Sequence, residues 1–570
     1  MISKNDYSFR FSKSSKHLNS VLLIIPMILL FIGVYGGLMQ ALFRAGIVQS
    51  DPFVGGDYYK GLTFHGVLNA LVFTTFFAVA FGNAIIPYSL RKKLNSKVAW
   101  TAGIMMLVGS VLAAVYILMG EATVLYTFYP PLKAHPFFYI GLTLVVVGSW
   151  VASYNWVPMY LEWRRENKDK KTPLAVVGMF TTFIIWFIAS IAVAVEILFM
   201  LLPWSLGLVD EVNVMLARTL FWFFGHPLVY FWVLPAYVMF YVFLPKIAGG
   251  KLYSDMAGRL VFMLFIVFSI PVGTHHQYMD PAIGAQWKYL HGIFTFAVAL
   301  PSLITAFTIA ASLEHAGRNR GATGLFNWMG RLPYFDKERW FFSYLITGLI
   351  IFVFGGIGGI INASPQLNTV IHNTAWVPGH FHLTVAGPVL LAFLAGSLYM
   401  IGQFMNKKVR LKGTAMLMPY VYTIGLFIMS YGLKVGGLKG MPRRTNTGAS
   451  YANPDSILYQ ADWIPYIEMT VVGGVIMFIG IVMFIASFFA TVFSKSEPGS
   501  ETDDGGVDVT FPISESLHDE EAKFLRNFKP YIIIAVILIV LSYAPVIYDV
   551  LQATYGGSLP YSPDSPVPLR

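Results

Sequence analysis

Long apolar runs recur along the whole chain, and they constrain its fold more than any other feature. Each run has about 20 residues or more, which is the length an α-helix needs to cross about 30 Å of hydrocarbon. Charged residues make up only 12% of the 570 residues, against about a quarter in soluble domains. The short segments of alternating polarity that are typical of membrane β-barrels are absent. The sequence therefore predicts an all-α integral membrane protein.

Thirteen of these runs are long enough to span a membrane, and we expect them to form a single bundle over residues 1–570. The first follows a polar, basic start and is too long for a signal peptide, so we expect a retained helix and a cytoplasmic N-terminus. The predicted spans are 21–43, 62–90, 99–120, 137–160, 174–203, 215–245, 258–279, 286–313, 340–361, 375–402, 414–436, 465–493 and 528–550.

Lysine and arginine alternate between the loops in the way that sets membrane orientation. The loops predicted to be cytoplasmic are rich in them, and the outer loops are poorer, apart from Arg443 and Arg444. The net charge of +10 therefore reflects topology and does not indicate a nucleic-acid partner. Thirteen spans place the C-terminus outside. Residues 494–527, with the acidic run SEPGSETDDGG, are predicted to be a solvated cytoplasmic linker.

Histidine is the main metal or haem ligand available to this chain. It has no cysteine, which excludes disulfides, iron–sulfur clusters, thiolate metal centres and a covalently attached c-type haem. Histidines inside spans are informative, because ionisable groups there are costly and usually face the interior or a cofactor. Of the 12 histidines, four fall in loops or at helix ends and are expected at the surface: His17, His135, His315 and His518.

Three histidines within spans can form one metal site. His226 lies in the middle of the sixth span, in FFGHPLVYFWVLPAY, with Tyr230 four residues later on the same helical face. Alone, His226 would more often be a core histidine than a ligand. His275 and His276 are adjacent, and adjacent side chains on a regular helix diverge by about 100°. They can share a metal only if the backbone is distorted, which the proline and glycine just before them favour. Three neutral imidazoles suit copper.

His65, His380 and His382 make a second set at a similar depth. Residues two positions apart on a helix point about 200° apart, so His380 and His382 face opposite sides and cannot share one metal. Two flat cofactors flanking this helix would take one imidazole each, and His65 could complete one of them from across its ring. The iron of the other cofactor would then keep an open position.

The stretches GHPLVYFWVLPAY, GTHHQY and HNTAWVPGHFHL together resemble the catalytic subunit of haem–copper terminal oxidases. The likeness runs from the first span to the last and is strongest to the type B branch, the bacterial cytochrome c oxidases with thirteen helices. It implies a subunit of the bacterial plasma membrane that reduces O₂ to water and translocates protons. It also implies electrons from cytochrome c through a partner subunit II with a dinuclear copper centre, which this cysteine-free chain cannot supply.

The resemblance also assigns the site residues. It implies that His65 and His382 are the axial ligands of a low-spin haem b. His380 would be the single ligand of a high-spin haem of A or O type. The copper ion CuB would be bound by His226, His275 and His276. Tyr230 would be joined covalently to the ring of His226 and would supply an electron and a proton to O₂. The residues expected around the haem propionates are Arg443, Arg444, His372 and Asn373.

Asn368 and Leu228 mark departures from patterns known in this family. Asn368 stands where the family usually carries an aspartate near the high-spin haem propionates. Leu228 stands where proton-pumping type A enzymes have a glutamate, so a glutamate-gated second proton channel is not supported. Glu196, inside the fifth span, is expected to be a buried helix-packing acid.

Hydroxyl side chains at helical spacing resemble the single K-type proton pathway of type B oxidases. They are Tyr237 and Tyr241 in the sixth span and Ser302, Thr305 and Thr308 in the eighth. Without the resemblance, hydroxyls bonded to their own helix backbone would explain this pattern about equally well.

Three other functions fit parts of the pattern. A quinol-oxidising enzyme would differ in its electron donor. A nitric oxide reductase needs added glutamates near the metal and lacks the tyrosine, so Tyr230 and Leu228 argue against it. A transporter that relays protons through scattered histidines would contain no haem, and an optical spectrum would distinguish it from an oxidase.

Overall fold

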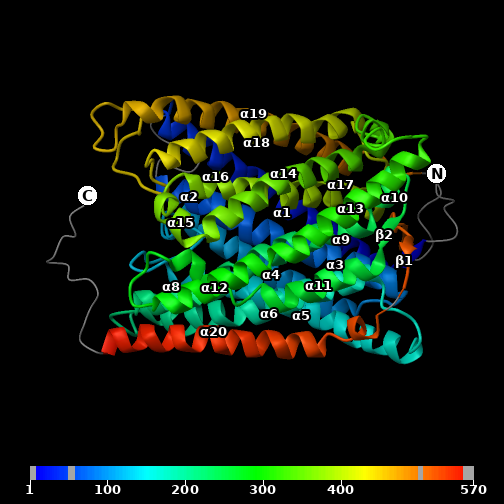
Figure 1. Ribbon diagram of the computed structural model, residues 1–570, viewed down its shortest axis with the longest axis horizontal. Coiled ribbons are helices and arrows are strands. Elements are labelled where there is room, and N and C mark those ends of the chain that lie inside the picture. The colour runs from blue at the N-terminus through cyan, green and yellow to red at the C-terminus, as the bar shows by residue number, and fades with distance from the viewer. Residues whose placement is uncertain (1–7, 49–57, 498–504, 521, 556–570) are drawn as a thin grey trace.

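The computed structural model describes residues 8–48, 58–497, 505–520 and 522–555, and within them the protein is almost entirely helical (Figure 1). Twelve helices in these ranges are long and apolar enough to cross a membrane. Seven are single helices: α1 (Lys13–Arg44), α4 (Ser96–Leu118), α5 (Pro136–Glu166), α14 (Trp340–Ala363), α18 (Lys412–Leu438), α19 (Ile464–Val492) and α20 (Lys529–Tyr555). Five are composite: α2 (Tyr58–Gly66) with α3 (Thr74–Leu90), α6 (Leu174–Glu196) with α7 (Leu202–Ser205), α8 (Val214–Gly225) with α9 (Pro227–Val242), α12 (Ala285–Ala297) with α13 (Ala299–Asn319), and α16 (Trp376–Phe381) with α17 (Leu390–Phe404).

The seventh predicted span is the one that differs from expectation. Its helix, α11 (Asp255–Phe268), has only 14 residues, and the rest of the predicted stretch 258–279 is turns and a short 3₁₀ segment, Gly273–Gln277. Pro271 lacks a backbone donor, which ends the helical hydrogen bonding. A Cβ atom on Gly273 would lie 2.2 Å from the Trp222 carbonyl oxygen, so this turn fits tightly against α8. The distortion expected from the adjacent histidines is present.

Two of the composite helices contain π-helical turns beside histidines. Residues Val67–Phe73 follow His65, and residues His382–Val389 begin with His382 itself. A π-helical turn adds a residue to the helical repeat and is frequent at functional sites. Both turns lie where the chain must aim an imidazole at a neighbouring helix.

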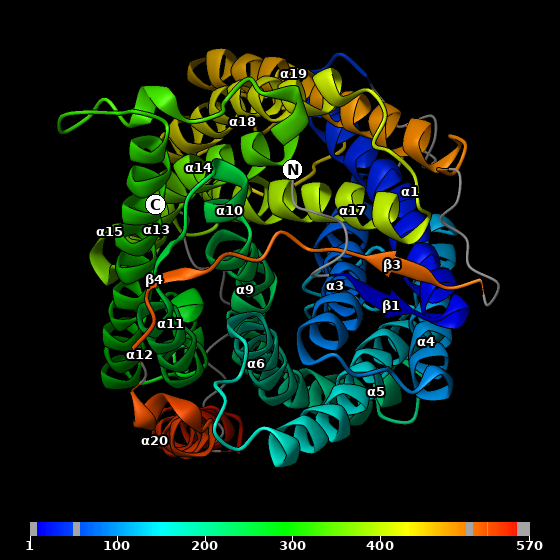
Figure 2. The same ribbon diagram turned by 90° about the vertical axis from the view of Figure 1, so that its right-hand side faces the viewer.

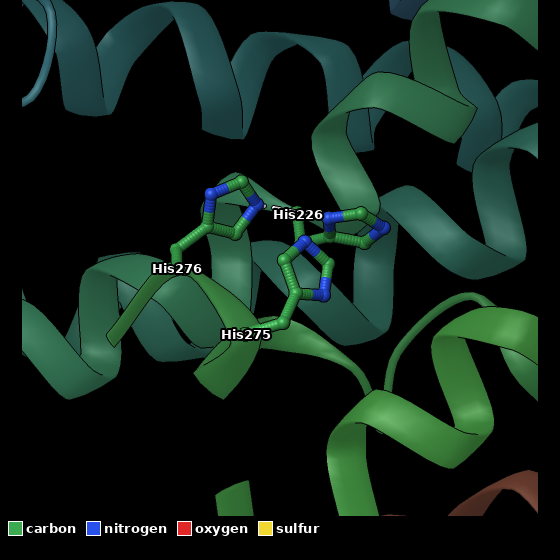
Figure 3. A group of neighbouring side chains, drawn as sticks. All are labelled: His226, His275 and His276. Atoms are coloured by element: carbon green, nitrogen blue, oxygen red, sulfur yellow. Dashed lines mark hydrogen bonds between the residues drawn. The ribbon is translucent and has the colours of Figure 1, made fainter. Parts of the chain in front are cut away.

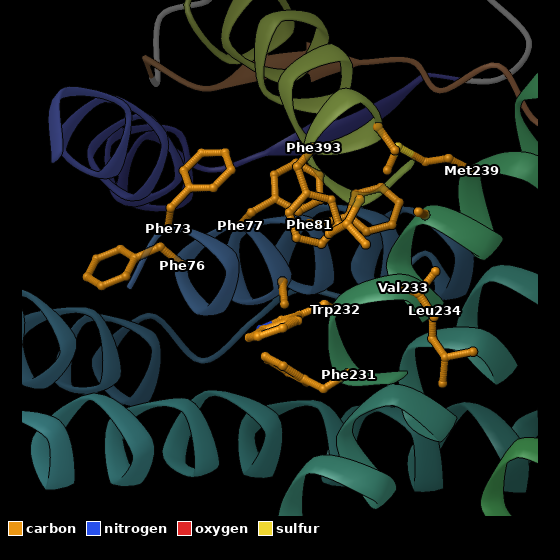
Figure 4. Packing of buried hydrophobic residues seen from close by; sticks show 14 of the residues in the cluster. Phe73, Phe76, Phe77, Phe81, Phe231, Trp232, Val233, Leu234, Met239 and Phe393 are labelled. Atoms are coloured by element: carbon orange, nitrogen blue, oxygen red, sulfur yellow. The ribbon is translucent and has the colours of Figure 1, made fainter. Parts of the chain in front are cut away.

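Small residues let the helices approach closely, and aromatic residues fill the interior. A Cβ atom on Gly109 of α4 would lie 2.4 Å from the Gly141 oxygen of α5. Such close backbone contact is a main source of helix association where lipid removes the hydrophobic driving force. In the interior, the rings of Phe77 (α3) and Phe393 (α17) stack with centroids 4.0 Å apart (Figure 4). Short helices α10 (Leu244–Ala248) and α15 (Pro365–Ile371) complete the bundle.

Two small sheets close one end of the bundle (Figure 2). Strand β1 (Phe9–Phe11) pairs antiparallel with β3 (Val507–Val509), and β2 (Leu252–Ser254) pairs parallel with β4 (Ser516–His518). Residues 505–520 of the predicted linker are thus a strap over the helix ends, and the Tyr399 hydroxyl donates to the Thr510 carbonyl at 2.6 Å. The acidic residues at 501–504 and the C-terminus at 556–570 lie outside the described residues. The C-terminal end of α20 lies at the end of the bundle away from β1 (Figure 1).

Candidate functional site

His65 of α2 and His382, the first residue of the π-helical turn after α16, face each other across a gap. Their rings are nearly parallel, at 13°, with centroids 6.1 Å apart. The Nδ1–H of His65 donates to the Gly33 carbonyl at 2.8 Å, and that of His382 donates to the Pro378 carbonyl at 2.7 Å. With Nδ1 occupied in both rings, each Nε2 is left as a ligand atom. Two metal–nitrogen bonds of about 2 Å each fit between the rings, so the pair matches a six-coordinate haem iron.

A cavity of about 290 Å³ contains both of these imidazoles. Most of its lining is apolar and comes from α1, α2, α16, α18, α19 and the two π-helical turns, and Arg443 and Arg444 also line it. A largely apolar cavity lined by two imidazoles and two guanidinium groups fits a haem with its propionates.

Arg443 is placed for an anionic ligand. Its Nη2 donates to Asn373 Oδ1 at 3.2 Å, but its buried Nε has no hydrogen-bond partner within the described part of the chain. Burial, and then the neighbouring Arg444, lower the pKa of Arg443 to about 9. Arg444 in turn donates to the Thr127 hydroxyl at 3.1 Å. A partly buried guanidinium with an unused donor and a like charge beside it is stabilised by a carboxylate.

His226, His275 and His276 form the only candidate cluster of metal-ligating side chains found in the described ranges (Figure 3). One ligand atom from each lies within 4.8 Å of the others, and His226 Nδ1 is 3.0 Å from His276 Nε2. His226 lies at the break between α8 and α9, where Pro227 begins the new helix, and the other two lie on the 3₁₀ turn after α11. Three imidazole nitrogens gathered this closely form a donor set for one ion, which would bind them at about 2 Å.

Neighbouring groups hold each ring of this cluster in place. The His275 Nδ1–H donates to Thr295 Oγ1 at 2.8 Å, which leaves Nε2 for a metal. The His276 ring stacks on Trp222 at a centroid distance of 3.8 Å. The Tyr230 hydroxyl lies 2.8 Å from His226 Nε2, so His226 presents Nδ1 to the cluster and its other nitrogen to the phenol.

His380 points away from the pair formed by His65 and His382. Its ring stacks on Trp376, one turn earlier in α16, with centroids 5.7 Å apart. Its Nδ1 is buried against the glycine-rich wall of α14 and has no hydrogen-bond partner of good geometry there. The structure thus separates His380 and His382 on two sides of one helix.

Comparison with known proteins gives the family. The family profile described as "Cytochrome C and Quinol oxidase polypeptide I" matches residues 19–476. The chain belongs to this family. It is 41% identical over 540 residues to cytochrome c oxidase subunit 1 of Thermus thermophilus, covering 92% of this chain and 93% of that protein. A cryo-EM structure of a heme-copper terminal oxidase dimer superposes with a TM-score of 0.91 at 49% identity, covering 97% of this chain and 96% of the other. Cytochrome c oxidase subunit 1 of Bacillus sp. PS3 is 25% identical, over 73% of this chain and 67% of its own length. The resemblance to haem–copper oxidases and the all-α fold are confirmed.

In this cytochrome c and quinol oxidase family member, Asn368 is hydrogen-bonded to His372. The His372 Nδ1–H donates to Asn368 Oδ1 at 3.1 Å, and the Asn368 amide donates to the Asn362 carbonyl at 2.7 Å. Burial, and then the guanidinium of Arg443, lower the pKa of His372 to about 4. The pair is therefore neutral at pH 7, with a carboxamide where the resemblance led us to expect a carboxylate.

The hydroxyl residues of the predicted proton pathway lie next to one another between α9 and α13. Tyr237 donates to Ser302 at 3.3 Å, and Tyr241 donates to Thr305 at 2.7 Å. Thr305 and Thr308 each also donate to the carbonyl four residues earlier, as in ordinary helix packing. Ser312, which we did not predict, adds a hydroxyl one turn further along α13 and accepts from the Tyr253 amide at 2.8 Å.

Sequence reasoning missed the ion pair of Arg218 and Asp280. Arg218 Nη2 lies 2.8 Å from Asp280 Oδ1, and its guanidinium is stacked 4.6 Å from the ring centroid of Tyr129. An arginine inside the sixth predicted span and an aspartate four residues after the double histidine were visible signals, but their pairing is a tertiary contact. Glu196 is fully buried and its carboxyl oxygens have no partner in the described ranges.

Proposed function

We propose that the chain is the catalytic subunit of a respiratory haem–copper oxidase, which reduces O₂ to water and couples this to proton uptake and translocation. The observation that carries the proposal is the three-histidine cluster with the Tyr230 hydroxyl 2.8 Å from His226 Nε2. The parallel pair of His65 and His382 and the separate His380 support it.

The residues fit one copper ion and two haems. His226, His275 and His276 would hold CuB, His65 and His382 a low-spin haem b, and His380 a high-spin haem of A or O type. These groups, when bound, supply the electron transfer to O₂. The protein's own contribution would be two imidazoles for one haem and a single imidazole for the other, which would leave only the second haem able to bind O₂.

Tyr230 is positioned to give a proton and an electron where O₂ is reduced. Its hydroxyl lies within hydrogen-bond distance of His226, a proposed copper ligand, so loss of the phenol proton would directly affect that imidazole. Reduction of one O₂ to two waters consumes four electrons and four protons. The hydroxyl file of Tyr237, Ser302, Tyr241 and Thr305 offers a route by which such protons reach the buried phenol.

Electrons are proposed to come from cytochrome c through a partner subunit that carries a dinuclear copper centre. The 41% identical Thermus thermophilus protein is a cytochrome c oxidase subunit 1, whereas the ubiquinol oxidase subunit 1 of Acetobacter aceti is 23% identical. We further propose that the protein lies in a bacterial plasma membrane with the strap and β1 on the cytoplasmic side, as the lysine and arginine distribution indicates.

Spectra and metal analysis of the purified complex test this function. We expect low-spin and high-spin haem bands, two irons and one copper per copy of this chain in addition to any partner metals, and O₂ consumption with reduced cytochrome c. A purified complex without haem bands would refute the oxidase function and leave the transporter alternative, and non-haem iron in place of copper would indicate a nitric oxide reductase. Faster O₂ consumption with a quinol than with cytochrome c would overturn the proposed donor.

A further inference from the structure

Lys434 is a cation inside the bundle, next to His380. It lies on α18, one turn before that helix ends at Leu438, and it is half-buried. Its ammonium nitrogen is 5.3 Å from the ring centroid of Trp376, and the Trp376 ring stacks on His380 at 22°. The ammonium and the imidazole therefore both neighbour the same indole ring.

Glycines on α16 and α14 make room for the side chains of Lys434 and His380. A Cβ atom on Gly379 would lie 3.0 Å from Lys434 Cγ, so the bare backbone before His380 makes room for the lysine stem. A Cβ atom on Gly358 of α14 would lie 2.8 Å from His380 Nδ1 and 3.3 Å from Lys434 Nζ. The two nitrogens thus border the same small space, and any side chain at Gly358 would fill it.

The direction of this side chain is unusual for a lysine near the end of a span. Such lysines normally extend towards the head groups and keep their charge in water. Lys434 extends sideways instead, towards Trp376 and Gly358. Among the described residues no carboxylate forms an ion pair with it, whereas Lys439, just past the end of the same helix, pairs with Asp462 at 3.4 Å. The charge of Lys434 therefore acts on its surroundings without a counter-ion.

We propose that Lys434 is a positioning residue that raises the reduction potential of the haem held by His380, by placing an uncompensated positive charge beside the proximal imidazole. This inference rests on the proposed role of His380. A nearby cation favours the iron with one less positive charge, and it does so strongly where little water screens it. It also makes the imidazole a weaker electron donor to the iron, which again favours the ferrous state.

The charge acts on one of the two haem sites more than on the other. Leu433, the residue before Lys434, lines the cavity that contains His65 and His382, but Lys434 does not. Helix α18 thus presents an apolar side chain to the low-spin site and a charge to the high-spin site. The charge of Lys434 would therefore favour transfer of one electron from the low-spin haem, which is oxidised, to the high-spin haem, which is reduced.

The test compares Lys434→Met with Lys434→Arg in the intact complex with its partner subunits. The matched control is Lys439→Met, which removes the same charge from the exposed end of the same helix. Potentials of both haems are measured by redox titration with optical detection, and the iron–histidine stretch of the ferrous high-spin haem is measured by resonance Raman spectroscopy. We expect Lys434→Met to shift the electron distribution from the high-spin to the low-spin haem by about tenfold, which is about 59 mV for one electron. We expect the iron–histidine stretch to rise in frequency.

The other variants separate charge from structure. Lys434→Arg should keep both readouts near wild type, and Lys439→Met should change neither. An unchanged electron distribution in Lys434→Met, or equal shifts of both haems, would overturn the inference. If Lys434→Met does not bind haem, Lys434→Gln serves as the neutral variant with the same two outcomes. A wild-type complex without a high-spin haem would instead refute the proposed function, before any Lys434 variant is made.

Discussion

Replacing Asn368 by aspartate is expected to raise the pKa of His372. The His372 Nδ1–H now donates to a neutral oxygen 3.1 Å away, and burial together with Arg443 holds the pKa at about 4. A carboxylate in that place would attract the imidazolium by about 1.3 kcal/mol at a dielectric constant of about 80, and by about 5 kcal/mol at about 20. At about 1.4 kcal/mol per pKa unit, this is a rise of about one to four units.

The lower half of that range is the expected outcome. The Asn362 carbonyl, which accepts the Asn368 amide at 2.7 Å, would face the second carboxylate oxygen and oppose its charge. We therefore expect a rise of about one to two units. The pKa of His372 also determines how the free energy of unfolding changes with pH. Between about pH 4 and 6.5 the unfolded wild-type chain binds a proton at His372 that the folded chain does not, so the free energy of unfolding falls as the pH drops through this window. In Asn368→Asp this pH window is narrower, so the free energy of unfolding falls by less as the pH drops through it.

NMR titration of protein labelled with ¹⁵N-histidine measures this pKa directly. The His372 resonance is identified by its absence in His372→Asn. Thr369→Asp is the matched control, because it adds the same charge to α15 at an exposed position. A His372 pKa that rises no more in Asn368→Asp than in Thr369→Asp would refute the electrostatic reasoning.

Three further substitutions test the rest of the site. His276→Ala should abolish O₂ reduction and copper binding but leave the low-spin haem spectrum intact; retained turnover in an oxygen electrode would contradict its role as a ligand. Tyr241→Phe removes the hydroxyl that donates to Thr305 at 2.7 Å, and should slow steady-state turnover by about tenfold or more with normal haem content; wild-type turnover would mean that this hydroxyl serves only packing. Gly437→Ala would place a Cβ atom 2.1 Å from the Trp376 amide nitrogen, and should lower the thermal unfolding midpoint by several degrees; an unchanged midpoint would show that α16 and α18 can move apart.

The sequence predicted most of the bundle, because apolar runs of membrane length have few alternatives. It placed every long helix, and it anticipated the distorted backbone at His275 and His276 from the conflict between two adjacent ligands and one metal. The sequence did not predict contacts between segments that are far apart in the chain. Arg218 and Asp280 are 62 residues apart, and the position of Lys434 beside His380 depends on how α16, α14 and α18 pack together. No local pattern records such distances.

The strap was missed for a related reason. Residues 505–520 include four acidic residues, two glycines and one proline, which is typical of a solvated linker. Their strands form only because β1 and β2, far earlier in the chain, offer backbone partners at the same end of the bundle. A three-residue strand has too weak a signal to be predicted alone.

The pairing of β1 with β3 also sets an order of events during synthesis. Arg10 and Asp508, which face each other in this sheet, are 498 positions apart, and a ribosome needs about 25 to 100 s to make that length at about 5 to 20 residues per second. The first strand therefore remains without its partner until nearly all the helices have entered the membrane. During this interval the end of the bundle has no strap across it. Closure of that end by the strap is therefore among the last steps in the folding of the chain.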